Sequence, residues 1–209
     1  SGDIIGSFAL TEPGAGSDAG SLSTSAKRDG NHYILNGVKR YITNAPQAGI
    51  FTVMARTDSN SSGPAGVSAF IVERDTEGIT IGKKDTKMGQ QGIHTADVNF
   101  QNCRVPVRNR IGEEGQGFKT AMKVLDRGRL RIGGLSVGAA ERLISECVSY
   151  SKERIQFKKP IAEFQLIQAM LADSKAEAYA ARCMLIDSAE RRDNGETITM
   201  EAACTKMFA

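Results

Sequence analysis

A turn rich in glycine and hydroxyl groups near the N-terminus has residue types that could bind a ligand. Residues 8–18 read FALTEPGAGSD, an apolar strand-like start followed by a run of one proline and two glycines. Proline removes a backbone donor and glycine frees φ, so the strand breaks there. The exposed N–H groups, with the hydroxyls of Thr11 and Ser17, make a concave surface that suits anions and polar ligand edges. An ordinary surface turn explains the stretch equally well, because one glycine-rich loop is weak evidence.

Charge and hydropathy exclude two classes of partner. The 209 residues carry 27 basic and 24 acidic side chains, for a net charge of +3, without a dense basic run. Such a balance does not favour nucleic acid as a partner. No apolar stretch reaches the roughly 18 residues of a membrane span. The N-terminus shows no charged leader followed by an apolar block, so no secretory signal is expected.

The cysteines and histidines do not form a metal pattern. Cys103, Cys147, Cys183 and Cys204 contain no CxxC pair, and His32 and His94 are the only histidines. We therefore expect no metal site. The last three cysteines lie among helix-forming residues, which predicts small buried thiols in a reducing compartment. A hydrolase would need one of the two histidines as its base, and neither lies in a motif that favours this.

The first half of the chain has the pattern of a β domain. Up to about Gly112, turns recur every few residues and apolar residues alternate with period two. Two turns, at 29–31 and at Asn36-Gly37, read as hairpin turns because Asn, Asp and Gly tolerate positive φ. The expected strands are 4–10, 22–28, 32–35, 38–42, 50–56, 67–72, 79–82 and 96–100. Strands at this spacing predict an antiparallel barrel or sandwich.

The second half changes to helical periodicity. From Phe118 to about Arg154, apolar residues fall three or four apart, which predicts one long helix. Gly133-Gly134 inside it costs roughly 2 kcal/mol in helix propensity, so we expect another helix or a ligand to pack close there. A second helix is expected over 163–192, ended by Asn194-Gly195. Thr199 is the expected N-cap of a third helix that runs into Ala209.

Together these elements predict an α+β multidomain fold. Residues 1–114 form an antiparallel β-barrel or sandwich domain, and residues 115–209 form an incomplete antiparallel helical bundle. The last helix has no stop signal and the first strand starts near residue 1, so we expect the chain to be a fragment of a longer protein. The exposed apolar face of the bundle would then need further helices or another subunit.

Several further motifs follow the N-terminal turn in order. They are NGVKRYITN at 36–44, MGQQG at 88–92, VP at 105–106, IGE at 111–113, GQGF at 115–118, LDRGR at 125–129, RIQF at 154–157 and EFQ at 163–165. With FALTEPGAGSD, this series resembles the acyl-CoA dehydrogenase family. The resemblance covers that family's middle β domain and the first part of its C-terminal helical domain. The family's N-terminal helical domain and last helices have no counterpart in these residues.

The resemblance implies an FAD-dependent oxidation of acyl-CoA thioesters to trans-2-enoyl-CoA. In the family, a base removes the α-proton, the β-hydrogen leaves as hydride to flavin N5, and electrons pass to an electron-transfer flavoprotein. An acyl-CoA oxidase or a nitroalkane-oxidase-like flavoenzyme, reoxidised by O₂, is a close alternative. A non-enzymatic ligand-binding module that has lost FAD is the alternative from another class. The implied compartment is the cytoplasm of a bacterium or the mitochondrial matrix of a eukaryote.

The resemblance also implies which residues bind FAD. Phe8, Leu10 and Thr11 would line the flavin ring. Ser17 would bind either the FAD pyrophosphate or the neighbouring CoA moiety. Tyr41, Ile42 and Thr43 would follow the flavin on a second strand, with Tyr41 stacked near the ring and Thr43 near N5. Many relatives carry Trp where this chain has Tyr41.

A third set of residues implies an oligomer. Arg154, Gln156, Phe157 and Gln165 resemble residues that reach the FAD of a neighbouring subunit, which implies a homodimer or homotetramer. An arginine fork suits pyrophosphate oxygens, although a solvated charge is the commoner fate of arginine.

Two charged residues on the long helix are candidates for substrate binding. Asp126 and Arg129 lie three residues apart and share one helix face, where the resemblance places the CoA tail. A simple surface ion pair, worth under about 0.5 kcal/mol, is the alternative.

No catalytic base is expected within the chain. Most of the family uses a glutamate near the C-terminus, which would lie beyond Ala209. A branch of the family places the base one residue before the arginine of the long helix, and that residue here is Gly128. Glu12 and Glu113 occupy motif positions that the family does not use for proton abstraction. We therefore expect these 209 residues to be inactive by themselves.

Overall fold

The computed structural model describes residues 2–61 and 63–209. The chain divides into two compact units, residues 1–122 and 123–209. Helix α1 (Gly117–Glu153) begins in the first unit and continues in the second. The domain boundary predicted at 114/115 precedes this division by a short distance, and it stays a prediction.

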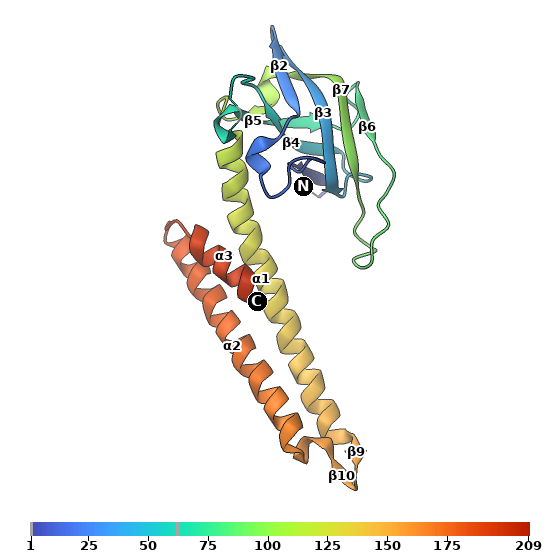
Figure 1. The fold of residues 1–209 in the computed structure, drawn as a ribbon, viewed down its shortest axis with the longest axis vertical. Coiled ribbons are helices and arrows are strands. Elements are labelled where there is room, and N and C mark those ends of the chain that lie inside the picture. The colour runs from blue at the N-terminus through green and yellow to red at the C-terminus, as the bar shows by residue number, and fades with distance from the viewer. Residues whose placement is uncertain (1, 62) are drawn as a thin grey trace. The chain divides into compact units, whose positions relative to one another are not determined.

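The first unit is built on one eight-stranded sheet (Figure 1). Its strands are β1 (Gly6–Ala9), β2 (Ser25–Asp29), β3 (His32–Thr43), β4 (Ile50–Arg56), β5 (Val67–Glu73), β6 (Ile79–Ile81), β7 (Thr95–Pro106) and β8 (Arg110–Ile111). The strand order is β6-β7-β3-β2-β4-β5-β8, and β1 pairs with β4. Short 3₁₀ helices occupy Ala19–Ser21, Pro64–Gly66 and Val107–Asn109.

The predicted fold class, a β domain followed by a helical unit, is confirmed, but the sheet is mixed instead of purely antiparallel. Strands β1 and β2 both run parallel to β4. Parallel neighbours need an intervening crossover, and β3 provides it between β2 and β4. The described strand order runs from β6 to β8 without joining these ends, so the sheet is not a closed barrel.

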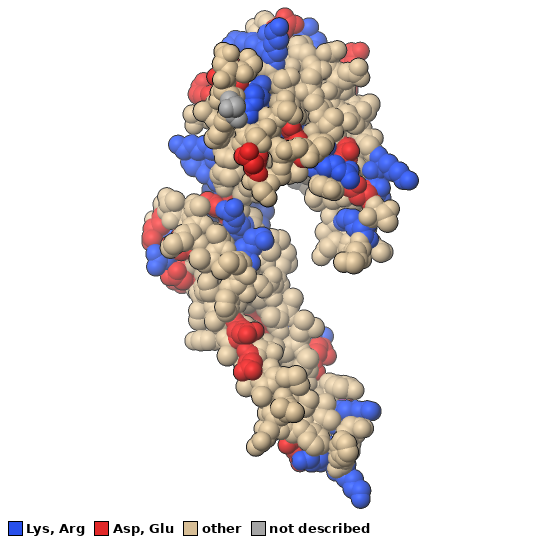
Figure 2. All heavy atoms as spheres, in the orientation of Figure 1, with Lys and Arg blue, Asp and Glu red and all other residues tan. Residues whose placement is uncertain are grey.

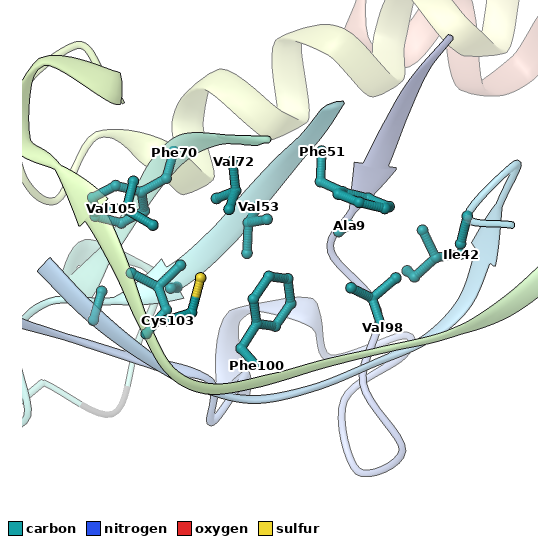
Figure 3. Packing of buried hydrophobic residues seen from close by; sticks show 14 of the residues in the cluster. Ala9, Ile42, Phe51, Val53, Phe70, Val72, Val98, Phe100, Cys103 and Val105 are labelled. Atoms are coloured by element: carbon teal, nitrogen blue, oxygen red, sulfur yellow. The ribbon is translucent and has the colours of Figure 1, made fainter. Parts of the chain in front are cut away.

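The sheet curls so that its two halves share one core. Figure 3 shows Phe51 and Val53 pointing toward Val98 and Phe100 on the facing strand. All four side chains are at most 3% exposed. The rings of Tyr33 and Phe70 meet edge to face with centroids 4.9 Å apart. The period-two apolar pattern therefore marks the inner face of the sheet, as the sequence predicts.

Asn36-Gly37 does not form the predicted hairpin turn, so the expected pair of strands at 32–35 and 38–42 is wrong. Strand β3 runs unbroken through both residues and pairs with β7. The register with β7 shifts between Leu35 and Gly37, and the extra residue lies on β7, because Leu35 pairs with Cys103 and Gly37 with Phe100. Gly37 has a φ of 151°, and a Cβ there would lie 2.7 Å from Thr24 Cα. Glycine is needed because Thr24, the residue before β2, approaches too closely for any side chain, which local turn propensity cannot reveal.

The start of α1 is pressed against strand β5. A Cβ placed on Gly117 would lie 2.6 Å from Ser68 Cα and 2.5 Å from Ala69 N. Nearby, the hydroxyl of buried Tyr33 donates a hydrogen bond to Glu114, and Arg110 donates one to the Tyr33 oxygen over 3.2 Å. These contacts fix the segment that leads from the sheet into α1.

Gly117→Ala is expected to lower the free energy of unfolding by about 3 kcal/mol, because the added methyl group meets backbone atoms that cannot move aside. Gly138→Ala on the same helix is the matched control, since a Cβ there meets nothing within 4 Å. That control is expected to raise the free energy of unfolding by up to about 1 kcal/mol. Urea denaturation of both variants measures the difference. Equal effects of the two variants would contradict the close approach.

The second unit contains three helices and a short hairpin (Figure 1). Helix α1 is followed by strands β9 (Ile155–Gln156) and β10 (Lys159–Pro160) and a 3₁₀ turn (Ile161–Glu163). Helix α2 (Gln165–Asp193) ends at a C-cap on Asn194, and Gly195 follows with a φ of 85°, as predicted. Helix α3 is Thr199–Phe208.

The close packing predicted at Gly133-Gly134 is confirmed. A Cβ on Gly133 would lie 2.9 Å from Thr205 Cγ2, so α3 crosses α1 at this glycine. Ser188 and Thr205 share a buried hydrogen bond of 2.9 Å between α2 and α3. Leu130, Ile198 and Ala202 form a small buried cluster beside these contacts. The helix propensity lost at the glycines is therefore offset by helix–helix packing.

Two predictions for the helical half of the chain are wrong: the N-cap of the third helix and the burial of the cysteines. Thr199 is the first residue of α3, whose N-cap is Ile198 without a side-chain bond, because the Thr199 hydroxyl donates to Asp126 instead. Cys147 and Cys183 are exposed and Cys204 is half-buried, whereas Cys103 is the buried thiol. Helical periodicity shows that a residue lies on a face, but it does not show whether the same chain covers that face.

Much of the apolar surface of the helical unit is not covered by the described residues. Leu135, Leu143, Leu166 and Tyr179 are each at least 64% exposed. The visible middle part of this unit is largely uncharged, whereas charges of both signs are interspersed on the first unit (Figure 2). None of the helices in residues 2–61 and 63–209 is long and apolar enough to cross a membrane.

Candidate functional site

Two motif segments that are distant in sequence lie side by side in the first unit. One contains β1 and residues 10–12, and the other is the end of β3 at residues 39–43. Ser7 Oγ donates to Thr43 O at one end, and Arg40 N donates to Thr11 O over 2.8 Å at the other. The segments that resemble flavin-binding strands are therefore adjacent.

A buried ion pair fastens the two segments. Lys39 Nζ lies 2.8 Å from Glu12 Oε1, and both side chains are at most 3% exposed. Lys39 also donates to Leu10 O over 3.0 Å. The Glu12 carboxylate further accepts hydrogen bonds from Ser23 N, Ser23 Oγ and Thr24 N, at 2.7, 2.7 and 2.9 Å. Each charge is thus paired and hydrogen-bonded, as burial requires.

The surroundings of this pair determine its protonation. Burial by itself raises the pKa of Glu12, but the positive charge of Lys39 and hydrogen bonds from Lys39, Thr24 and Ser23 together lower that pKa from 4.5 to about 2. Burial lowers the pKa of Lys39 to about 8, although Glu12 opposes the change. At neutral pH both groups are charged, so Glu12 is a poor proton acceptor.

The glycine-rich turn is anchored at its base and open at its tip. Glu12 N donates to Ala15 O over 3.0 Å, and Ala15 N donates to Glu12 O over 3.2 Å. Gly14 and Gly16 are exposed, and a Cβ on either would meet nothing within 4 Å. The hydroxyls of Thr11, Ser17 and Thr43 have no protein partner among the described residues, so they are available to a ligand.

Tyr41 projects from a bulge of β3. The register with β7 shifts between Lys39 and Ile42, and Tyr41 adopts a φ of 58°. Its side chain is 63% exposed, while the Arg40 guanidinium carbon lies 4.3 Å from the ring centroid. Arg40 forms ion pairs with Asp97 at 2.6 Å and with Asp85 at 3.0 Å. The ring therefore has one cationic neighbour and considerable free surface.

The predicted flavin residues differ in whether their side chains are exposed to a ligand. Leu10 and Ile42 are buried at 7% and 2% exposure, and Figure 3 shows Ile42 pointing into the core. These two residues can contact a ligand only through backbone atoms. Phe8 and Thr11 are half-buried, and Ser17, Tyr41 and Thr43 are exposed. Side-chain contacts are thus limited to these last five.

The predicted interface residues gather at one end of the helical unit. Arg154, Gln156 and Gln165 are exposed, and Phe157 is 88% exposed. Phe157 and Lys158 form the hairpin turn with φ values of 49° and 67°, and the Phe157 ring meets Phe164 edge to face at 6.2 Å. Arg154 has no ion-pair partner among the described residues. This end can therefore contact a molecule outside the unit.

Asp126 and Arg129 form the expected ion pair, with Nη1 and Oδ1 2.6 Å apart. The other Asp126 oxygen, Oδ2, accepts a hydrogen bond of 2.9 Å from Thr199. Asp126 thus joins α1 to α3 within the second unit. Both carboxylate oxygens are already engaged, so Arg129 has the more available side chain for an anionic substrate group.

Lys39, Arg40, Asp85 and Asp97 are not among the site residues that the sequence predicts. A signal for Lys39 existed, because it follows Tyr33 and Leu35 at even spacing and so falls on the inner face of β3. The other three gave no local signal, since their pairing depends on the register of β3 against β7.

No cluster that could hold a metal ion occurs among the described residues. The buried Cys103 thiol has a pKa raised to about 11 by burial, which keeps it in the unreactive protonated form.

Comparison with known proteins defines the family. The acyl-CoA dehydrogenase middle-domain profile matches residues 7–103, and the acyl-CoA dehydrogenase C-terminal-domain profile matches residues 115–209. The chain belongs to the acyl-CoA dehydrogenase family. The two matches confirm the family that the sequence motifs indicate. Members of this family are oxidoreductases and flavoproteins.

Individual relatives match across almost the whole chain. The caffeyl-CoA reductase–Etf complex subunit CarC of Acetobacterium woodii is 46% identical over 97% of this chain and 53% of its own length. The structure of butyryl-CoA dehydrogenase from Megasphaera elsdenii has a TM-score of 0.94 at 43% identity, covering 98% of this chain and 54% of the other. A structure described as PigA with FAD and proline has a TM-score of 0.95 at 33% identity, covering 98% and 53%. The chain thus spans about half the length of the relatives it matches.

Proposed function

We propose that this chain provides the FAD- and acyl-CoA-binding part of an acyl-CoA dehydrogenase. The observation that carries the proposal is the adjacency of residues 10–12 and 39–43, with free hydroxyls and an open Tyr41 ring on the same segments. Polar donors beside an exposed aromatic ring suit the edge and face of an isoalloxazine. The reaction is removal of two hydrogens across the α and β carbons of an acyl-CoA thioester to give trans-2-enoyl-CoA.

The roles of the residues follow from their exposure. The hydroxyls of Thr11 and Thr43 hydrogen-bond the polar edge of the ring, and the backbone of Leu10 and Ile42 lines it. Bound FAD supplies the acceptor for the β-hydrogen as hydride. Donors fixed by the Glu12–Lys39 pair need no reorganisation when negative charge develops on the ring. Ser17 and the open glycine backbone bind a phosphate of FAD or of CoA.

Arg129 contributes positive charge to the CoA tail, and the exposed hairpin end binds the FAD of a neighbouring subunit. Arg154 there pairs with the pyrophosphate, because its guanidinium has no other ion-pair partner among the described residues. This role requires a homodimer or homotetramer. The proton-abstracting base lies outside these 209 residues. The compartment is bacterial cytoplasm or mitochondrial matrix.

Electron-transfer flavoprotein is the proposed redox partner, since the Acetobacterium relative is named as a subunit of an Etf complex. The same relative is named a reductase, which favours reduction of a 2-enoyl-CoA as a second candidate function. Both reactions use the same flavin and thioester sites. Their direction depends on the reduction potential of the bound flavin and of its partner.

The proposal is tested on the whole protein that contains this chain. Purified protein is expected to be yellow, and anaerobic addition of butyryl-CoA is expected to bleach the flavin absorbance within seconds. Readmission of air should restore the colour slowly if the enzyme is a dehydrogenase, and rapidly with peroxide formation if it is an oxidase. Protein that stays colourless after FAD addition would instead support a non-enzymatic binding module and overturn the proposal.

A further inference from the structure

We propose that Arg40 is a positioning residue that holds the Tyr41 ring as the stacking surface for the flavin. This inference rests on the proposed function, because it assigns a second residue to the same FAD site. It concerns Arg40 itself, whose side chain is held by contacts with β7, with the segment before β7 and with the neighbouring ring.

The guanidinium is fixed in place by two carboxylates. Arg40 Nη1 lies 2.6 Å from Asp97 Oδ1, and Nη2 lies 3.0 Å from Asp85 Oδ1. Asp85 is itself held, since Thr95 Oγ1 donates to it over 2.8 Å and Asp85 N donates to Thr95 O over 2.9 Å. A planar guanidinium bound through two different nitrogens cannot rotate freely, unlike the ammonium of lysine.

The held cation then restrains the ring. Its central carbon is 4.3 Å from the Tyr41 centroid, within the range of a cation–π contact. Tyr41 is otherwise 63% exposed, so few other contacts limit its rotamers. Fixing an exposed ring before a ligand arrives reduces the conformational entropy that binding must remove. One side of the ring faces Arg40, and the exposed side is free to stack on a planar ligand.

The backbone of Arg40 joins the same arrangement to the glycine-rich turn. Arg40 N donates to Thr11 O over 2.8 Å, while the preceding Lys39 binds Leu10 O and Glu12. Asp97 lies opposite this bulge, between the cross-strand pairs Lys39–Val98 and Ile42–Ala96. One residue thus links the Thr11 backbone, the Tyr41 ring and strand β7. A solvated surface arginine would not need this set of contacts.

The test is a double-mutant cycle on FAD affinity in the whole apoprotein. Arg40→Met keeps a long side chain and removes the charge and the fork, and it is expected to weaken FAD binding roughly 3- to 10-fold. Quenching of FAD fluorescence in the bound state should also decrease, because the ring stacks less closely. Arg40→Lys keeps the positive charge, so it should lose less FAD affinity and less fluorescence quenching than Arg40→Met. In a Tyr41→Leu background, Arg40→Met should change FAD affinity less than 2-fold.

Arg104→Met is the matched control, because Arg104 also pairs across the sheet, with Asp29 at 3.3 Å, on an exposed part of β7. It should leave FAD affinity and fluorescence unchanged. Thermal unfolding of each apoprotein separates a positioning role from loss of stability. An equal loss of affinity from Arg40→Met with and without Tyr41→Leu would overturn the inference, as would no loss in either. Wild-type protein that binds no FAD would overturn the proposed function and the inference with it.

Discussion

Glu12→Gln is expected to lower the free energy of unfolding of the first unit by about 3–5 kcal/mol, the usual cost of leaving one partner of a buried ion pair unpaired. The substitution leaves the Lys39 ammonium, which is fully buried, without its counter-charge. It also weakens the hydrogen bonds that Ser23 and Thr24 donate to the carboxylate. Urea denaturation followed by fluorescence or circular dichroism measures the change.

Two further variants show whether the pair is responsible. Glu113→Gln removes a carboxylate that is 87% exposed and pairs with Arg110 at 3.3 Å, so a change below about 0.5 kcal/mol is expected. Adding Lys39→Met to Glu12→Gln removes the orphaned charge and should recover a large part of the loss. The explanation is wrong if adding Lys39→Met lowers the free energy of unfolding further, as two independent losses would.

The same pair predicts how stability depends on pH. The pKa of Glu12 is lowered in the folded protein from 4.5 to about 2. A carboxylate with a lowered folded-state pKa stabilises the fold above its unfolded-state pKa, and this stabilisation disappears as the pH falls through the folded-state value. Wild-type stability should therefore drop between about pH 5 and pH 2 by on the order of 3 kcal/mol more than that of Glu12→Gln.

The 209-residue chain, mixed with FAD and an acyl-CoA, is expected not to bleach the flavin, whereas the whole protein should do so. General-base catalysis contributes on the order of 10²–10⁴-fold, and we place the base outside these residues. Within the chain, Glu12 is unsuited to the role because its pKa is lowered to about 2 and its oxygens are all engaged. Anaerobic stopped-flow spectroscopy on both samples gives the comparison.

The control for this prediction uses the whole protein, so its result does not depend on whether the isolated chain folds. Glu113→Gln should reduce the flavin at the wild-type rate, because Glu113 is highly exposed and paired with Arg110. A rate lowered 100-fold by that substitution would place the base inside the chain. Bleaching by the 209-residue chain alone would lead to the same conclusion.

Local sequence determined the bounds of the strands and helices in which one face is buried, because burial of one face produces a regular apolar pattern. Strand β4 has the predicted bounds of 50–56, and α1 differs from its predicted ends by one residue. The family motifs indicated the fold class and the candidate flavin residues, and the glycine pair in α1 indicated a close helix crossing. These features depend on periodicity and short motifs, which a single sequence contains.

Only the tertiary structure decided which residues meet. Asn36-Gly37 reads as a hairpin turn in the sequence but lies inside β3, opposite an irregularity in β7, and Thr24 packs against Gly37. Thr199 reads as an N-cap, but its hydroxyl binds Asp126, 73 residues earlier. Arg40 meets Asp85 and Asp97 because of the register of β3 against β7, and Lys39 meets Glu12 because the segment after β1 lies beside β3. The physical reason is that a hydrogen bond or ion pair between distant residues depends on strand register and packing, which no local propensity encodes.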